Sequence, residues 1–374
     1  MVTSQILKNC LEELRAISRT EFCLQDPVGT PIVTTEGAAV PEQQVIAAFA
    51  ESDVDSQIIG NRYFLKVMDE DETAYVLTAI GDNDYTLMVA RMAVSELQNL
   101  LVAYKEKYDR NNFFQNLMLD NLLLVDIHNR AKKLHIPYQV PRVIIIFEIE
   151  KAADTMAQEL LSRLYTSQNG DYLTEVDENS IILIKSVRSE TDYATAQEAA
   201  TIAVDMLNTE AMLKVRASFG SIAGELKDLS KSYKEARMAM DVGGIFYAEK
   251  RVISYGELGI GRLIYQLPVN LCEMFINEIF GTSLEENLDN ETLTTINTFF
   301  ENSLNVSETS RKLFIHRNTL VYRIEKLQKS TGLDIRTFED ALTFKIALMV
   351  VEYMNYLKSR ERKIYCLTPR NRKD

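Results

Sequence analysis

The residue types with the most specific chemistry stand close together near the end of the chain. Arg317 and Asn318 open a helical pattern. An arginine can donate two hydrogen bonds to guanine, and an asparagine can pair with adenine. Tyr322, Arg323 and Lys326 follow at spacings that place them away from the apolar side of that helix. This arrangement predicts a helix whose first turn reads base edges in a major groove.

The surrounding sequence predicts the elements that position these side chains. A short helix over Ser307–Leu313 precedes a tight turn at Phe314–Ile315, and a longer helix follows over Arg317–Ser330 until Gly332 ends it. Short helix, tight turn and long helix make the helix-turn-helix pattern. Ser310 supplies a small residue where the helices cross, and the inner face of the longer helix carries Leu320, Ile324 and Leu327. The alternative, a helical hairpin with a basic solvated face, does not explain that small residue.

The residues that would meet DNA fall into two groups. The shorter helix would cross the phosphates, and the first turns of the longer helix would reach the bases. His316, directly before the longer helix, would cap it or contact a phosphate. The predicted DNA-binding residues are Ser307, Thr309, Arg311, Lys312, His316, Arg317, Asn318, Thr319, Tyr322, Arg323 and Lys326.

Charge is distributed unevenly along the 374 residues, whose formal net charge is −13. Of 41 Lys/Arg and 54 Asp/Glu, residues 305–374 hold 15 and 8, which gives +7 there and leaves 26 and 46, or −20, for residues 1–304. An acidic body with a basic end favours a nucleic-acid partner at that end. The length predicts two or three domains, and 46% hydrophobic with 25% charged residues excludes a disordered or collagen-like chain.

No other site chemistry is predicted. The four cysteines are widely scattered and the chain has three histidines, so we expect no metal site, no disulfide framework and no cofactor. The first residues lack the basic and apolar regions of a signal peptide, and no apolar run approaches the roughly 20 residues of a membrane span. We therefore expect a soluble, cytoplasmic protein without a membrane partner.

The segment Asn305–Ile324 closely resembles the C-terminal helix-turn-helix of the PucR/CdaR family of bacterial transcriptional regulators. His316–Arg323 carries the family's H-R-N-T-L-x-Y-R pattern, Thr331–Asp334 its T-G-L-D pattern, and Tyr255–Leu263 resembles its junction between domains. The resemblance covers residues 135–357. It implies a regulator that binds operator DNA, senses a small metabolite such as a sugar diacid or purine catabolite, and often activates a catabolic operon. The DNA contacts that it carries over are Arg317, Asn318, Thr319, Tyr322 and Arg323.

Residues 135–260 alternate strand and helix patterns in the order β-α-β-β-α-β-α, which is ferredoxin-like. Arg216–Ala223 and the following helix resemble the GGDEF family of nucleotide cyclases. The hairpin at Thr174–Ser180 lacks that family's paired glycines and the acidic pair after them, and Gly243–Gly244 is expected only to end a helix. We predict a degenerate GGDEF-like domain with no catalytic residues, so the protein is not expected to be an enzyme; a nucleotide cyclase or phosphodiesterase-type activity is the alternative.

The first ninety residues predict a small α+β domain. A helix over Gln5–Ser18, a strand pair, a second helix and three β-rich runs (Ser56–Met68, Thr73–Ile80 and Tyr85–Ala90) resemble PAS- or GAF-type sensors in element order. Residues 1–90 would then sense the effector. Arg62 and Arg91 either pair an anionic effector or are ordinary surface residues, and we favour the second interpretation.

Residues 91–134 contain neither Pro nor Gly and predict one long helix. Its spacing of Leu97, Leu101, Tyr104 and Tyr108 is that of a coiled-coil seam, which favours a dimerising helix over a helix packed on its own domain. Residues 261–374 would form the all-α helix-turn-helix DNA-binding domain. The predicted fold class is α+β multidomain, and the predicted assembly is a homodimer.

Overall fold

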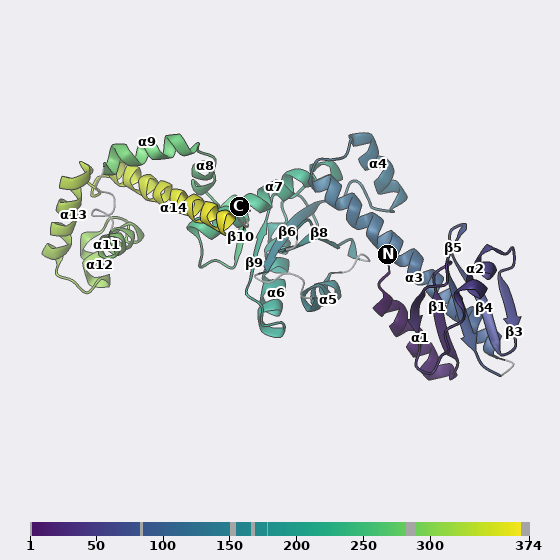
Figure 1. Ribbon diagram of the computed structural model, residues 1–374. Helices are drawn as coiled ribbons and strands as arrows, with labels where there is room; N and C mark the ends of the chain where they lie inside the picture. Colours follow the sequence, from purple (N-terminus) through teal and green to yellow (C-terminus); the bar gives the residue numbers. More distant parts are fainter. Residues whose placement is uncertain are drawn as a thin grey trace, which may run out of the picture. The chain divides into compact units, whose positions relative to one another are not determined.

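The computed structural model describes residues 2–82, 85–149, 155–165, 169–177, 179–281 and 289–367. These residues form two compact units. The first consists of Met1–Asn116 with Asn129–Ile136, and the second of Leu117–His128 with Pro137–Asp374 (Figure 1). Parts of the predicted turns at 81–84 and 174–180, and the predicted helix start near Ala153, lie outside the described residues. None of the described helices is long and apolar enough to cross a membrane.

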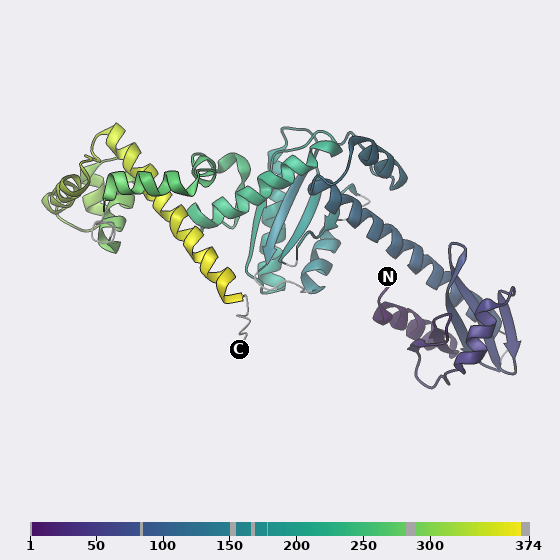
Figure 2. The same ribbon diagram turned by 45° about the horizontal axis from the view of Figure 1, so that its top comes forward.

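The first unit is built on an antiparallel five-stranded sheet in the order β2-β1-β5-β4-β3 (Figures 1 and 2). Helices α1 and α3 cover one face and contribute Leu7, Leu11 and Leu97 to its core. Helix α2 covers the other face, where its Phe49 packs on Phe64. The bounds are α1 Ser4–Ser18, β1 Glu21–Gln25, β2 Pro31–Thr34, α2 Gln43–Glu51, β3 Ser56–Ile59, β4 Arg62–Asp69, β5 Glu72–Ile80 and α3 Thr86–Met118.

Two predictions for this region are wrong. The run Tyr85–Ala90 is not a strand, because α3 already begins at Thr86. A short apolar run does not by itself distinguish strand from helix, and here Ala90, Ala93 and Leu97 recur at helical spacing and are buried against the sheet. Three residues of the predicted coiled-coil seam, Leu97, Leu101 and Tyr104, also pack on their own unit in the same core, whereas the fourth, Tyr108, is exposed.

The predicted helix over residues 91–134 is not continuous. Helix α3 ends at Met118, and α4 covers Leu124–Lys133. Between them Asp120 adopts a left-handed backbone conformation with φ of 57°, which is incompatible with a continuing right-handed helix. The Asp120 carboxylate accepts a hydrogen bond from Lys234 of helix α7.

The second unit contains a sheet in the order β10-β9-β6-β8-β7, in which β9 and β10 pair in parallel and the other pairs are antiparallel. Helices α5 and α6 lie on one face and α7 lies on the other (Figure 1). The bounds are β6 Arg142–Ile149, α5 Thr155–Leu164, β7 Tyr172–Thr174, β8 Ser180–Ser186, α6 Tyr193–Glu210, β9 Val215–Phe219, α7 Leu229–Phe246 and β10 Val252–Ser254. The sequence predicted each of these except β10.

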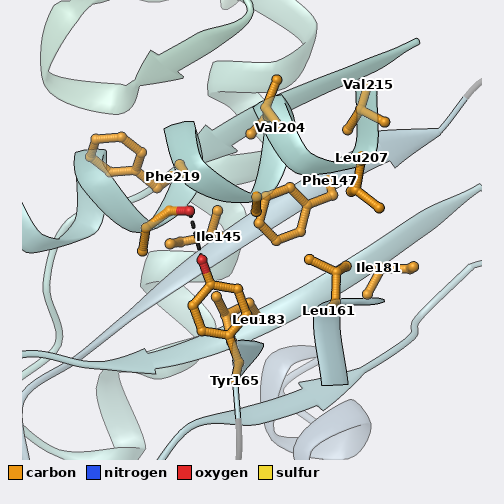
Figure 3. Close-up of a cluster of buried hydrophobic side chains, with 14 of the residues drawn as sticks. Ile145, Phe147, Leu161, Tyr165, Ile181, Leu183, Val204, Leu207, Val215 and Phe219 are labelled. Carbon is orange, nitrogen blue, oxygen red and sulfur yellow. Dashed lines mark hydrogen bonds between the residues drawn. The ribbon is translucent and has the colours of Figure 1, made fainter. Parts of the chain in front are cut away.

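Alternate residues of β6 face the two helix layers. Ile145 and Phe147 belong to the core under α5 and α6, where the Tyr165 hydroxyl donates a 2.7 Å hydrogen bond to the carbonyl of Ala199 (Figure 3). Burial raises the pKa of this phenol to about 12, so it remains a protonated donor at neutral pH. On the other face, the Ile144 amide donates to the Ser232 hydroxyl of α7.

Helix α7 approaches the sheet very closely, which explains several glycines. A Cβ at Gly220, the residue directly after β9, would stand 2.0 Å from the Ser232 carbonyl oxygen, so there is no room for a side chain there. The Gly243–Gly244 pair does not end the helix, contrary to the prediction, because α7 continues to Phe246. A Cβ at Gly243 would stand 2.9 Å from Ile253 of β10, so this glycine serves close packing.

The rest of the second unit is helical. Helices α9, α11 and α13 pack on the first half of α14. The core that they share contains Phe299, Leu320, Ile324 and Phe344. The second half of α14 packs with α8, α9 and the end of α7 through Val350 and other apolar residues. Helix α14 therefore contacts both the helix-turn-helix and the helix that covers the sheet. The bounds are α8 Gly261–Tyr265, α9 Val269–Phe280, α11 Asn290–Glu301, α12 Val306–Lys312, α13 Arg317–Thr331 and α14 Phe338–Leu367; single 3-10 turns cover Leu226–Asp228 and Tyr255–Glu257.

Candidate nucleic-acid interface

Helices α12 and α13 are held in a fixed crossing by small residues and caps. The Asn305 side chain caps α12 by accepting hydrogen bonds from the amides of Ser307 and Glu308 at 3.0 and 3.1 Å. Ser310 is 6% exposed where the two helices meet, as its size predicted. The Ile315 amide donates to the Ser310 carbonyl at 3.0 Å, which ties the turn back to α12.

The start of α13 is set by His316. Its Nδ1 accepts a 3.2 Å hydrogen bond from the Asn318 amide, so the imidazole acts as the helix cap, one of the two roles predicted for it. Gly332 ends the helix in the left-handed conformation with φ of 77°. Leu320, Ile324 and Leu327 are buried, as predicted from their spacing.

The outer side of α13 presents the polar residues that the sequence singled out. Arg317, Asn318 and Thr319 are exposed in its first turn, and Lys326 is exposed two turns further on. The Tyr322 ring is 67% exposed. Among the described residues, Arg317 and Lys326 have no acidic partner within ion-pair distance. Their positive charges are therefore available to phosphates or base edges.

Two residues predicted as DNA contacts are placed differently. Thr309 is completely buried, and its hydroxyl donates to the Asn305 carbonyl at 2.8 Å, so it belongs to the interior of α12. Arg323 is held by α11: its guanidinium donates to the Thr295 hydroxyl at 3.0 Å and pairs with Glu291. Helical spacing places Arg323 at the flank of the exposed face, where α11 reaches it. Arg323 therefore joins α13 to α11 in this structure.

The exposed residues of α12 are partly neutralised by acids of the same domain. Ser307 is exposed. Arg311 lies 3.4 Å from Glu308, and Lys312 lies 2.7 Å from Glu301. The Lys312 ammonium lowers the pKa of the Glu301 carboxyl by hydrogen bonding to it. Surface pairs of this kind are weak, so both cations can exchange their partner for a phosphate.

The sequence missed two features of this surface. Phe314, in the turn, is 96% exposed, although it was predicted only as part of a tight turn. Glu325 is exposed on the outer side of α13 beside the cations. Helical spacing from Leu320 and Ile324 places Glu325 outward, so the sequence carried that signal. Nothing in the sequence distinguished the exposure of Phe314 from that of Ile315.

In the described part of the hairpin at 174–180, the Asp177 carboxylate is engaged by neighbouring residues. Asp177 accepts hydrogen bonds from the Asn179 amide at 3.0 Å and the Ser180 hydroxyl at 2.7 Å through one oxygen. Its other oxygen lies 3.2 Å from Arg237. Within the described ranges, no cluster of three or more His, Cys, Asp or Glu residues is suited to a metal ion.

The first unit buries polar groups under α2, on the face of the sheet away from α1 and α3. Thr78 pairs in register with Cys23 and Phe64, so all three side chains share this face. The Thr78 hydroxyl is fully buried and finds no hydrogen-bond partner among the described residues. Burial raises the pKa of the Cys23 thiol, although Thr34 and Arg62 act in the opposite direction. Arg62 thus lies near this polar face.

A concavity of this unit lies between the end of α1 and the start of α3. It has a volume of about 480 Å³ and is lined mainly by apolar residues, with Arg19 as its cation: Leu14, Ile17, Ser18, Arg19, Tyr85, Val89 and Met92. Ile17 is 83% exposed, which shows that this concavity is an open groove.

Comparison with known proteins gives two family matches. Residues 292–350 match the PucR C-terminal helix-turn-helix domain, and residues 121–242 match the GGDEF-like domain. The chain is 24% identical to the carbohydrate diacid regulator of Escherichia coli over 71% of each chain. It is 25% identical to the purine catabolism regulatory protein of Bacillus subtilis over 64% of this chain and 48% of that one. It is 23% identical to the DNA-binding transcriptional activator AdeR of Bacillus subtilis over 70% and 65%.

A helix-turn-helix that follows a GGDEF-like domain defines this chain as a DNA-binding transcriptional regulator. The match at residues 292–350 contains the capped α12, the turn and all of α13, which are the elements that position Arg317 and Asn318. The two matched domains are those of the PucR/CdaR family of regulators. The chain spans about half the length of the purine catabolism regulator and 71% of the diacid regulator.

Proposed function

We propose that the protein binds a palindromic operator as a homodimer through the first turn of α13. The observation that carries the proposal is the exposure of Arg317 and Asn318 directly after the His316 cap, beside Thr319, Tyr322 and Lys326. In this proposal Ser307, Arg311 and Lys312 contact the phosphates. Two such helices would enter successive major grooves about 34 Å apart.

The test uses a duplex that the full-length protein selects from a random pool. Affinity for this duplex should fall steeply with salt, because each neutralised phosphate releases a counterion. Lys326→Gln should reduce the slope of log affinity against log salt by about 1. Lys231→Gln, at an exposed lysine of α7, is the matched control and should leave the slope unchanged. An equal slope for the wild type and Lys326→Gln would reject the assigned interface.

We also propose that residues 1–90 form a PAS- or GAF-like sensor for a small-molecule effector. The names of the relatives suggest a carbohydrate diacid or a purine catabolite as the class of effector. The polar face under α2 supports this proposal, because a buried hydroxyl without a partner is unusual unless a ligand or water satisfies it. The groove near Arg19 is the alternative site for the effector, and Arg19 is its cation.

The effector is best sought with the full-length chain. A compound that binds the folded state raises the unfolding temperature, by an amount that increases with its concentration. We expect a shift with one compound among sugar diacids and purines. We also expect Thr78→Val to abolish that shift, whereas Thr73→Val at the other end of β5 should preserve it. A shift that Thr78→Val leaves intact would place the effector elsewhere.

In the same proposal the middle domain, residues 135–260, is ferredoxin-like and has no catalytic activity. The engagement of both Asp177 oxygens by Asn179, Ser180 and Arg237 supports this, since these contacts give the carboxylate a role within the fold. The domain would instead relay the effector signal. Helix α3, which begins at Thr86 and lies mostly within residues 91–134, would lead from the sensor, and α14 (within residues 261–374) would join α7 to the helix-turn-helix core. Turnover of GTP or of a cyclic dinucleotide in the presence of Mg²⁺ would overturn this assignment.

A further inference from the structure

Phe314 stands out among the large apolar residues of the described chain. Its side chain is 96% exposed, more than that of any other exposed large hydrophobic residue in the described segments. It also has a φ of 55°, in the left-handed region that L-residues with bulky side chains rarely adopt. The residue lies in the turn between α12 and α13, where its amide donates to the Arg311 carbonyl at 3.1 Å.

Both features are unfavourable for the unbound protein. An exposed phenyl ring keeps its apolar surface in water, and glycine or asparagine fits the left-handed conformation with less strain. The residue contributes no buried contact that would offset these effects, because its ring is almost entirely outside the fold. A strained residue that exposes an apolar side chain at a binding surface indicates contact with a ligand.

The position of the turn identifies that ligand. In a helix-turn-helix, the first helix crosses the DNA backbone and the second enters the major groove, so the turn between them lies at the edge of the groove. Two cations flank Phe314 here: Arg311, whose side chain is 74% exposed, and Arg317, which is also exposed. Duplex DNA offers apolar surface at this edge, namely deoxyribose and the methyl group of thymine.

We propose that Phe314 is a DNA-contacting anchor whose ring packs on deoxyribose and a thymine methyl at the edge of the groove. The inference rests on the proposed function and adds an apolar contact to the polar contacts of α13. It predicts that this one residue contributes to affinity at the expense of the stability of the free protein.

The first test replaces Phe314 in the full-length chain with residues that suit its backbone. Phe314→Asn and Phe314→Gly should weaken binding to the selected duplex about tenfold or more, since burying a phenyl ring is worth at least one decade in affinity. They should leave the unfolding temperature unchanged or raise it. Phe338→Asn, at a residue that is 71% exposed at the start of α14, is the matched control and should bind as the wild type does. Unchanged affinity in both Phe314 variants would overturn the proposal.

The second test does not depend on stability. The chain has no tryptophan, so Phe314→Trp introduces its only indole. Saturation with the selected duplex should quench or shift this emission and protect the indole from acrylamide. Phe338→Trp should show neither change. Acrylamide quenching of Phe314→Trp that is the same with and without DNA would overturn the proposal, as would protection that appears without DNA as the protein concentration rises, because a second copy would then cover the ring.

The same titrations separate this inference from the proposed function. If Arg317→Ala weakens binding and the Phe314 variants do not, only the anchor is rejected. If neither does, the whole assigned interface is rejected. Replacing thymine by uracil in the selected duplex removes the methyl group, and it should weaken the wild type more than Phe314→Gly. An equal loss in both would show that the ring does not contact a thymine.

Discussion

The helix-turn-helix and the first unit both bury an apolar core, but they differ in whether their polar residues of interest are exposed or buried. In the helix-turn-helix, Arg317, Asn318 and Tyr322 lie on the surface of α13. The position of this helix is fixed by its packing with α9, α11 and α14. In the first unit, the polar groups of interest, such as Thr78 and Cys23, are buried under α2. One region therefore presents its polar groups to the outside, whereas the other keeps them inside the fold.

Because of this difference, one kind of binding surface can be recognised from the sequence and the other cannot. A surface that contacts DNA needs particular side chains at particular helical positions, so its pattern appears in the sequence. A face that encloses a small molecule needs only a few hydroxyl, thiol or amide groups among apolar neighbours. Such groups are common in ordinary strands, so the sequence does not mark them. Only the strand register shows that they lie together on one face.

The largest effects on stability should come from truncating a buried side chain in each of the two cores. Ile324→Ala in the core of the helix-turn-helix and Leu77→Ala in the core of the first unit should each destabilise their own unit by about 2–5 kcal/mol, through lost burial and a cavity. Differential scanning calorimetry of the full-length chain should show that each substitution lowers a different transition. If both substitutions lower the same transition equally, the two units unfold as one and the comparison fails.

A smaller effect should separate Arg323 from its exposed neighbours. Arg323→Gln removes the ion pair with Glu291, and we expect it to lower the unfolding free energy by about 1 kcal/mol, because the pair is partly exposed. It should weaken DNA binding equally for all sequences. A base-substitution series on the selected duplex, read by fluorescence anisotropy, checks this. Loss of preference at one base pair would instead make Arg323 a base contact.

The smallest effect on stability is expected at the buried Thr78 hydroxyl of the first unit. Thr78→Val keeps the shape of the side chain and removes a buried group without a partner, so the unfolding free energy should rise by about 1 kcal/mol. Urea denaturation measures this change. A loss of stability would mean that the hydroxyl has a partner, such as a bound water, in the free protein.

Much of the fold could be predicted from the sequence, because period and turn residues mark most elements. The order around β6 and α7 followed from alternating strand and helix patterns. The start of α3 could not be predicted in this way, because the apolar run at 85–90 fits either a strand or a helix. Only the packing of Ala93 and Leu97 on the sheet decides for the helix. The break after Met118 was also hidden, because it depends on the left-handed Asp120 and not on a Gly or Pro.

The candidate site was predicted well for residues on the open side of α13 and less well for those at its edges. Arg317 and Asn318 needed only the helix phase and the cap at His316. Arg323 needed the position of α11, which is distant in sequence and supplies Glu291. Thr309 needed the depth at which α12 packs, and a seven-residue helix gives too short a period to show it.

The most direct test of DNA reading through α13 is a base-by-base comparison of the wild type with Arg317→Ala. Each base pair of the selected duplex is replaced in turn, and the affinity of both proteins is measured at one salt concentration. Base reading by α13 predicts that the wild type discriminates by about 1–3 kcal/mol at one guanine, and that Arg317→Ala loses discrimination at that pair alone. Identical base preferences in the two proteins at every position would contradict it.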